Sequence, residues 1–600
     1  MITNLGDSTH SEIGSTTQHP HHTGADRVRG QRPRAERWAR VANATLAVAT
    51  SITVTAVGVS VVSSVQWPAY TTSNVLRALT TAGQVLMIGT LCVAAILLRR
   101  VPVELACGSV QRWRAKFASF LAWAGISGYV TITVGMPLAA TRLYLGGLSP
   151  DQQHRIQLVG RFADSPVWRD ETFIALPPDE AAAWYWMAGR AAAILDLPGW
   201  EAFKLIAITS IAITATLSLL WWSRLVRAEL AIAITTITTA ATVAYAATDP
   251  ARAVCLLLMP AAVFSVWRST SSAITTGERD LAPTSPRFPA VAQLPALGAY
   301  LALCATFDRT AFGFAAPLMT AALLLAIVTN ARHRIDSVRP IIVSAIAAAI
   351  PALSWITYQS LCTASAFTDI VPSTTEWRVV VVILLAAAAP AFAWATRSAS
   401  LKVGTANQIN RALTALVLIG FVNFSQNIPN MLATHVEYAY TDTDGDGRRA
   451  DQFPASAVHH YRAVDNAIAT ATTPQPRRDI VVLTGDPSFL AIYPYSGFLP
   501  QSNRYSNPGA DYDSRVRAIR EWSTQRTAAE LVSALDRSPQ RPPSVFVLRR
   551  SGDGYVLRLA HDPTIDESRT YTTIMLGADL FDSRYFTRTD IGPFTVLARR

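Results

Sequence analysis

The chain has 600 residues, of which 50% are hydrophobic and 16% are charged, and its formal net charge is +11. This balance excludes an ordinary soluble multidomain enzyme and is typical of a membrane protein. Because basic membrane proteins commonly carry such a charge, no nucleic-acid partner is expected.

The first forty residues, 1–40, are polar and are predicted to form a disordered tail. His19, His21 and His22 in this tail would suit a metal site, but histidines in such a segment more often have no metal-binding role. The apolar run that follows is too long for a signal peptide and lacks a small-residue cleavage pattern, so it should remain as a membrane anchor.

Apolar runs long enough to cross a bilayer as helices recur from about residue 41 to about residue 431. They predict a transmembrane domain over 41–431 with about eleven helices, at 41–66, 75–98, 116–138, 203–222, 229–247, 252–267, 291–307, 312–329, 340–359, 377–396 and 412–431.

Arginine and lysine gather in the tail and in every second loop. By the positive-inside rule these segments face the cytoplasm, while the loops TDPAR and FDRTAF on the other side are short and nearly balanced. An odd number of spans then places the loop 139–202 and the C-terminal segment 432–600 outside. The expected location is the plasma membrane, with a cytoplasmic N-terminus and an extracytoplasmic C-terminal domain.

The five cysteines predict neither a disulfide framework nor a CxxC metal site. Three lie in expected spans, one faces the cytoplasm and one is alone outside. The exported segments should therefore fold without disulfide bridges.

The C-terminal segment is predicted to be an α/β domain. Strands are expected at IVVLT, SVFVLRR, GYVLRLA and PFTVLAR, with one helix over 514–536. Asp442, Asp444, Asp446 and Gly447 match the first half of a calcium-binding loop, but Phe453 occupies the position of the closing Glu. An Asp/Gly turn is the alternative, with Asp451 as a late ligand if a metal binds.

The loop 139–202 combines carboxylates, arginines and aromatic residues. Carboxylates can act as bases, guanidinium groups such as that of Arg190 can hold phosphate, and aromatic faces can stack on sugars. The alternative is an amphipathic loop that lies at the membrane interface, where Trp and Tyr are enriched.

Several segments resemble the galactan arabinofuranosyltransferases of mycolic-acid-bearing actinobacteria, which belong to the multi-span GT-C glycosyltransferases. The resemblance runs from about residue 40 to the end of the chain, and is carried by GGLSPDQQHR, RFADSPVWRDETFIALPP, AWYWMAGRAA, LPGWEAFK and AIYPYSGFLPQSNRYSNPGADYDSR.

The resemblance implies a GT-C-like helical bundle with an extracytoplasmic α/β domain. It further implies inverting transfer of arabinofuranosyl residues from decaprenylphosphoryl-arabinofuranose to cell-wall galactan, which primes arabinan synthesis in arabinogalactan. The polyprenyl-phosphate sugar donor, the galactan acceptor and the lipid bilayer are the expected partners. No cofactor is implied with certainty, and a divalent cation is left open.

Asp151 is the first candidate for the general base that deprotonates the acceptor hydroxyl. It would also serve as the N-cap of a helix that starts at Gln152, and the two roles are compatible. Gln152 and Arg155 would lie at the same helix end, where Arg155 binds the leaving phosphate or anchors the loop at the interface. Asp164 is the second catalytic candidate, with a turn cap before Ser165 as its alternative.

Aromatic and amide side chains supply the candidate sugar-binding residues. Trp184 and Trp186 would share a face only if their segment is extended, and packing on the bundle is their alternative. The C-terminal candidates could line an acceptor groove or be buried in the domain; they are Tyr493, Tyr495, Tyr505 and Asn507.

Two departures from the family pattern stand out. Asp179 and Glu180 follow the Leu-Pro-Pro stretch, and Arg504 stands where a His is usual. They leave room for a catalytically diverged protein of cell-envelope assembly. A membrane transporter is the other alternative, although the expected spans carry few charges and show no internal repeat.

Overall fold

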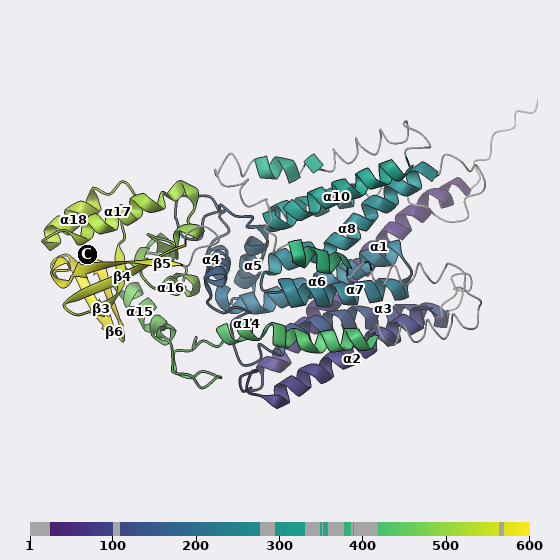
Figure 1. Ribbon diagram of the computed structural model, residues 1–600, viewed down its shortest axis with the longest axis horizontal. Helices are drawn as coiled ribbons and strands as arrows, with labels where there is room; N and C mark the ends of the chain where they lie inside the picture. Colours follow the sequence, from purple (N-terminus) through teal and green to yellow (C-terminus); the bar gives the residue numbers. More distant parts are fainter. Residues whose placement is uncertain are drawn as a thin grey trace, which may run out of the picture. The chain divides into compact units, whose positions relative to one another are not determined.

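The computed structural model describes residues 25–99, 109–275, 294–330, 349–350, 352–357, 377–385, 388, 418–562 and 569–600. Residues 47–600 form one compact unit. Mostly helical segments are followed by a C-terminal domain built around a sheet, as the sequence predicts (Figure 1).

Six helices among the described residues are long and apolar enough to cross a membrane. They coincide with the first six expected spans, and their apolar stretches are Trp38–Ser63, Asn74–Arg99, Arg112–Gly135, Gly199–Leu225, Ala228–Ala246 and Pro250–Trp267. The next two expected spans are shorter apolar helices, Ala296–Phe307 and Arg309–Leu325. The expected spans at 340–359, 377–396 and 412–431 lie wholly or partly outside the described residues, so six spans are supported and eleven remains a prediction.

The helices that carry these spans are α1 (Ala25–Ser63), α2 (Asn74–Arg99), α3 (Ser109–Val130), the π-helix η2 (Thr131–Gly135), α6 (Gly199–Leu225), α7 (Ala228–Ala246), α8 (Pro250–Thr275), α9 (Leu294–Phe307) and α10 (Arg309–Asn330). The start of α1 differs from the expectation of a disordered tail up to residue 40, because Ala25 already begins the helix. Alanine, glutamate and arginine in this segment favour a helix, whereas Gly30 and Pro33 oppose one, so propensity alone does not explain the extension.

The loop 139–202 folds into two helices, α4 (Pro150–Asp164) and α5 (Ala183–Ile194). Glycines allow them to pack closely on each other and on α6: a Cβ atom at Gly189 would lie 2.5 Å from Phe162 Cβ, and one at Gly199 would lie 2.6 Å from Gly160 Cα. Figure 1 shows α4 and α5 between the long helices and the C-terminal domain. The loop is thus a folded layer on one end of the bundle.

The C-terminal domain contains a seven-stranded sheet with the path β2-β1-β3-β4-β5, in which β7 pairs with β3 and β6. Its strands are β1 (Val481–Thr484), β2 (Ser496–Gly497), β3 (Val545–Ser551), β4 (Gly554–His561), β5 (Thr570–Gly577), β6 (Phe586–Ile591) and β7 (Phe594–Arg599). β1 runs parallel to β2 and β3, and the other pairs are antiparallel. The four expected strands are confirmed.

Helices cover both faces of this sheet. They are α15 (Tyr461–Ala471), α16 (Ser488–Ile492), α17 (Tyr512–Ser523) and α18 (Ala528–Asp536). Leu483 packs in a cluster with Trp522 of α17, whereas Val482 packs in another with Phe489 of α16, as the alternation of strand side chains requires. The single helix expected over 514–536 is two, because the Thr527 side chain accepts a hydrogen bond from Glu530 N (3.2 Å) and caps a new helix.

The segment proposed as a calcium loop forms an Asp/Gly turn. Asp442 Oδ1 accepts hydrogen bonds from the amides of Asp444 (3.1 Å) and Gly445 (2.9 Å), and Oδ2 accepts one from Gly447 N (2.7 Å). Within the described ranges, no cluster of three or more His, Cys, Asp or Glu side chains is arranged to hold a metal ion. The turn alternative therefore accounts for this segment.

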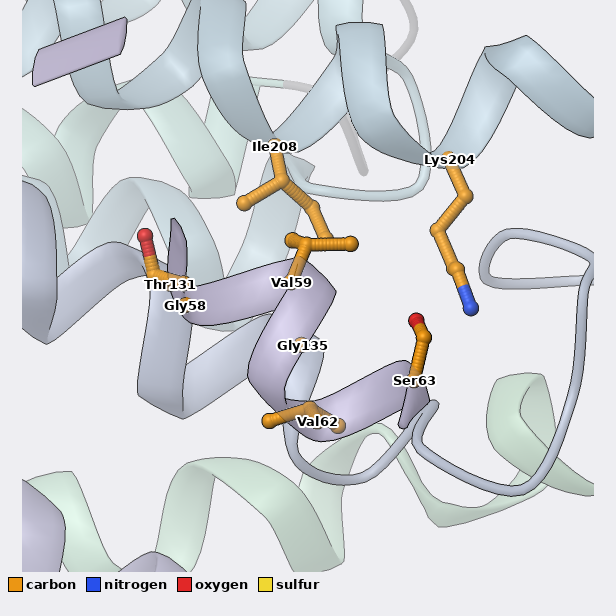
Figure 2. A pocket seen from close by; sticks show the side chains of 8 residues that line it. All are labelled: Gly58, Val59, Val62, Ser63, Thr131, Gly135, Lys204 and Ile208. Atoms are coloured by element: carbon orange, nitrogen blue, oxygen red, sulfur yellow. The ribbon is translucent and has the colours of Figure 1, made fainter. Parts of the chain in front are cut away.

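A narrow pocket lies inside the bundle between α1, η2 and α6 (Figure 2). Lys204 extends into it from α6, and its ammonium donates hydrogen bonds to Thr141 O (2.5 Å) and Leu138 O (3.4 Å). The remaining lining is small, aliphatic or hydroxylated: Gly58, Val59, Val62, Ser63, Thr131, Gly135 and Ile208. None of the residues that line this pocket is a carboxylic acid.

Candidate active site

Asp151 lies in the first turn of α4, where Pro150 takes the first helical position and Ser149 is the N-cap residue. The expectation that Asp151 itself caps the helix is therefore wrong, because Pro150 is compatible with the first helical position and moves the start upstream. The carboxylate is exposed and does not line the pocket of Figure 2. A carboxylate in the first turn is favoured by the helix dipole.

Two glycines set the position of this helix start. Gly146 and Gly147 have φ angles of +83° and +53°, which glycine adopts at little cost. Gly146 N donates to His435 O (2.7 Å) in the short helix α14 (Ala433–Tyr438), and a Cβ atom at Gly147 would lie only 1.9 Å from Tyr438 O. The Gly-Gly turn thus lets α4 begin directly against α14.

The C-terminal domain contacts Asp151 through Tyr505. The Tyr505 hydroxyl donates a hydrogen bond to Asp151 Oδ1, and Gln501 Nε2 donates to Pro150 O (2.6 Å). Burial and the Asp151 charge both raise the pKa of Tyr505, so its hydroxyl remains a donor at neutral pH. Of the four C-terminal residues expected to bind substrate, Tyr505 is the one that contacts Asp151.

His154 is buried beneath Tyr505, with the two ring centroids 5.5 Å apart. Its Nδ1 lies 3.2 Å from Glu171 Oε1 and its Nε2 lies 3.0 Å from Glu180 Oε2. Burial opposes the charged form, but the two carboxylates raise the pKa of His154 well above its usual value. The same contact overrides the effect of burial on Glu180 and lowers the pKa of that carboxyl to about 2.

Arg155 and Gln152 face the loop between α7 and α8. Arg155 Nη2 donates to Asp249 Oδ2 (2.9 Å), and Gln152 Nε2 donates to Thr248 O (2.5 Å). Burial would lower the pKa of Arg155, but the charge of Asp249 raises it. Both side chains predicted at this helix end are therefore found there, with Arg155 held as a cation.

A second ion pair extends the network to the start of α10. Arg252 Nε donates to Asp308 Oδ2 (3.0 Å), and Arg309 donates to the carbonyl oxygen of Asp179. Asp249 and Asp308 also cap α8 and α10, by accepting from Arg252 N (3.2 Å) and Ala311 N (2.6 Å). The ends of α4, α8 and α10 thus meet in one cluster of alternating charges.

Sequence reasoning assigned no role at the site to His154 or to the two short loops that carry Asp249 and Asp308. The spacing of Asp151 and His154, three residues apart, places them on one face of a helix and could have identified the histidine. The sequences TDPAR and FDRTAF each place an Asp next to the start of a helix, which is a capping signal. Only the tertiary fold brings these caps to α4.

Asp164 lies at the opposite end of α4 from Asp151. The two residues are thirteen positions apart in the sequence, which corresponds to about 20 Å of helix. Arg478 Nη1 of the C-terminal domain lies 3.4 Å from Asp164 Oδ2. The two candidate carboxylates are therefore not brought together, and Asp164 instead connects the loop to the C-terminal domain.

The aromatic candidates of the loop are positioned by α5. Because this segment is helical rather than extended, Trp184 and Trp186 point in different directions. Trp184 is buried against the edges of Tyr185 and Phe203, and Trp186 Nε1 donates to Pro166 O (3.0 Å). The packing alternative accounts for Trp184.

Arg190 follows one turn later on the same helix. Its Nη1 donates to Phe162 O (2.8 Å) and Ala163 O (3.4 Å), at the end of α4 that carries Asp164. Arg190 thus satisfies carbonyl groups of the last turn of α4, away from Asp151.

Three C-terminal candidates have structural contacts of their own. Tyr495 is buried and donates to Asp465 Oδ1 (2.7 Å), and the Arg477 guanidinium carbon lies 6.0 Å from the Tyr493 ring centroid. Asn507 Nδ2 donates to Asp170 Oδ2 (2.9 Å) and to Pro177 O (2.8 Å). Asn507 therefore fixes the loop 139–202 against the domain.

Each of the two departures from the family pattern places a residue at this site, Glu180 in one case and Arg504 in the other. Glu180 contacts His154, while Arg504 places its guanidinium carbon 5.9 Å from the Tyr505 ring centroid. Glu180 is connected to Tyr505 through the ring of His154, and Arg504 lies directly beside Tyr505. Both residues are therefore near the contact between Asp151 and Tyr505.

Comparisons with known proteins cover nearly the whole chain. Residues 43–370 match the family described as "Arabinofuranosyltransferase N terminal", and residues 428–599 match "Arabinofuranosyltransferase A C terminal". The chain is 33% identical to the galactan 5-O-arabinofuranosyltransferase of Mycolicibacterium smegmatis, over 92% of this chain and 97% of that protein. It is 34% identical to the protein of the same name from Mycobacterium leprae, with the same coverage. It is 26% identical to that from Corynebacterium glutamicum, over 81% of this chain and 84% of the relative.

Proposed function

Because this chain belongs to the galactan 5-O-arabinofuranosyltransferase family, we propose that it transfers arabinofuranosyl residues from decaprenylphosphoryl-arabinofuranose to cell-wall galactan and so primes arabinan synthesis. The site faces the outside of the plasma membrane, with the N-terminus in the cytoplasm and the C-terminal domain extracytoplasmic. A lipid-linked donor in the outer leaflet then presents its sugar at the level of α4.

The observation that carries the mechanism is the exposed carboxylate of Asp151, which the Tyr505 hydroxyl contacts from the C-terminal domain. Tyr505 occupies Oδ1, so Oδ2 is the atom that accepts the proton of the galactan hydroxyl. As that proton leaves, the hydroxyl oxygen bonds to the anomeric carbon, and the bond from that carbon to the phosphate oxygen breaks. The leaving phosphate keeps the electron pair, and the anomeric configuration inverts.

Arg155 is the guanidinium closest along the chain to this base. It lies one turn further along α4 and is held by Asp249 at 2.9 Å. A guanidinium at a helix N-terminus suits a phosphate leaving group, so Arg155 and Gln152 are assigned to the donor end of the site. His154 lies between the carboxylates of Glu171 and Glu180 beneath the reacting groups, and its single positive charge offsets only part of their negative charge.

The proposal is tested by transfer of radiolabelled arabinose from a prenyl-phosphate donor to a galactan oligomer in membranes that contain the protein. We expect Asp151→Asn to reduce kcat roughly 100-fold or more, as the loss of a general base does, with the protein still present in the membrane. Arg155→Met should raise KM for the donor.

Asp164→Asn distinguishes the second carboxylate from the first. It should lose little activity, because Asp164 lies at the far end of α4. Undiminished transfer by Asp151→Asn, or an equal loss in both variants, would contradict the assignment. Absence of transfer by the unsubstituted protein would remove the proposed activity itself.

A further inference from the structure

A second hollow, of about 350 Å³, opens where α14 leads into the C-terminal domain. Its lining includes Thr71 from the loop between α1 and α2, Glu437 and Tyr438 from α14, and Arg449, Asp451 and Phe453 from the Asp/Gly turn and the residues after it. We call it the linker pocket. None of these side chains belongs to the candidate active site.

The linker pocket has exposed aromatic rings at its edge. The side chains of Tyr438 and Phe453 are 59% and 66% exposed. Aromatic side chains of this size gain free energy when a partner covers them, and their flat faces suit the C–H faces of a sugar ring.

The polar part of the lining can hold a diol. Arg449 forms two hydrogen bonds with Asp451, from Nε to Oδ1 (3.0 Å) and from Nη2 to Oδ2 (2.6 Å). The Arg449 guanidinium carbon also lies 5.9 Å from the Phe453 ring centroid. A fixed guanidinium–carboxylate pair beside an aromatic ring presents donors and acceptors together, which is what neighbouring hydroxyl groups need.

The charge of the pocket disfavours an anionic ligand. Glu437 and Asp451 are acidic and Arg449 is basic, so the charged lining sums to −1. The excess negative charge would repel an anionic lipid headgroup, whereas it would not repel an uncharged polyhydroxylated chain.

The linker pocket also lies close to Asp151. Tyr438, which lines it, has its carbonyl oxygen against Gly147, and Gly147 precedes Asp151 by four residues. Four residues span at most about 14 Å of chain, so the pocket is within reach of an oligosaccharide bound at the base.

We propose that the linker pocket is a second acceptor subsite, which holds galactan sugars a few units away from the one that receives arabinose. This inference rests on the proposed function, because galactan is the acceptor there. It adds Tyr438 and Phe453 as residues that select a long acceptor over a short one.

The test compares the double variant Tyr438→Ala/Phe453→Ala with the unsubstituted protein in lipid nanodiscs. For a long galactan oligomer, KM should rise roughly 10-fold through the loss of two aromatic contacts, with kcat unchanged. For a disaccharide acceptor, which is too short to reach the pocket, KM should not change. Tyr571→Ala is the matched control, because Tyr571 is 50% exposed on β5 of the C-terminal domain.

A binding measurement without donor separates this inference from the proposed function. Saturation-transfer NMR with a long galactan oligomer should give a signal with the unsubstituted protein and the Tyr571 control, and a weaker one with the double variant. Equal signals, or an equal rise in KM for long and short acceptors, would overturn the subsite. A rise in KM for the lipid donor alone would mean that the pocket binds lipid, which also overturns it. Galactan binding without arabinose transfer would overturn the proposed function but not the subsite.

Discussion

The ion pair between Arg155 and Asp249 should be one of the strongest single contributions to holding α4 on the bundle. Its charged atoms are 2.9 Å apart, and the side chains are only 18% and 10% exposed. Coulomb's law with an effective dielectric constant of about 20 gives about 6 kcal/mol of attraction. Desolvation cancels part of this, so we expect a coupling energy of about 2–3 kcal/mol.

Asp249→Asn isolates the charge, because asparagine still caps α8 through the contact that Asp249 makes with Arg252 N. The variant leaves Arg155 buried without its carboxylate and should lose about 3 kcal/mol of unfolding free energy. The Arg155→Met/Asp249→Asn double variant should be more stable than the sum of the single changes predicts. Unfolding by SDS titration in mixed micelles measures the cycle. Additivity within about 0.5 kcal/mol would refute the reasoning.

Three further predictions concern the Gly-Gly turn, Tyr505 and the histidine contact. Gly147→Ala should lower the free energy of unfolding by at least about 3 kcal/mol in the same titration, because of the positive φ at this position and the clash with Tyr438 O. Gly89→Ala is the control: its added Cβ atom would meet no neighbouring atom, so it should not destabilise the protein. Tyr505→Phe should lower kcat roughly 10-fold without changing KM for the donor, because one charge-assisted hydrogen bond is lost; an unchanged kcat would show that the hydroxyl is dispensable. The lowered pKa of Glu180, about 2 against a usual 4.5, stabilises the fold above pH 4.5, and this stabilisation disappears as the pH falls toward 2. The melting temperature should therefore drop more steeply over this window in the unsubstituted protein than in Glu180→Gln, and parallel curves would argue against the contact with His154.

Local patterns were sufficient to predict much of the fold. The first six spans followed from length and hydropathy, and the continuous apolar run at Val481–Thr484 identified a buried strand of the C-terminal domain. β5 and β6 were missed because their exposed threonines and arginines dilute the apolar pattern. Trp184 and Trp186 were considered as a pair only for an extended segment, and α5 is helical.

The candidate site was predicted less completely, for a physical reason. Asp151, Gln152 and Arg155 lie close together in the sequence, so one helix was enough to group them. Asp249 and Asp308 join them only because three helix ends pack together, and no local sequence pattern predicts that packing. Tyr505 reaches Asp151 across more than three hundred residues of chain, and nothing in its immediate sequence distinguishes it from Tyr493 or Tyr495.

The contact between Tyr505 and Asp151 has a consequence for the biogenesis of the protein. Asp151, the proposed base, is made early, but Tyr505 is made only when most of the chain has been synthesised. Until then, the loop that carries Asp151 also lacks Asn507, which holds it through Asp170. A nascent or C-terminally truncated chain would occupy the membrane with its helices in place and still be inactive. Assembly of the active centre would thus be the last step of synthesis.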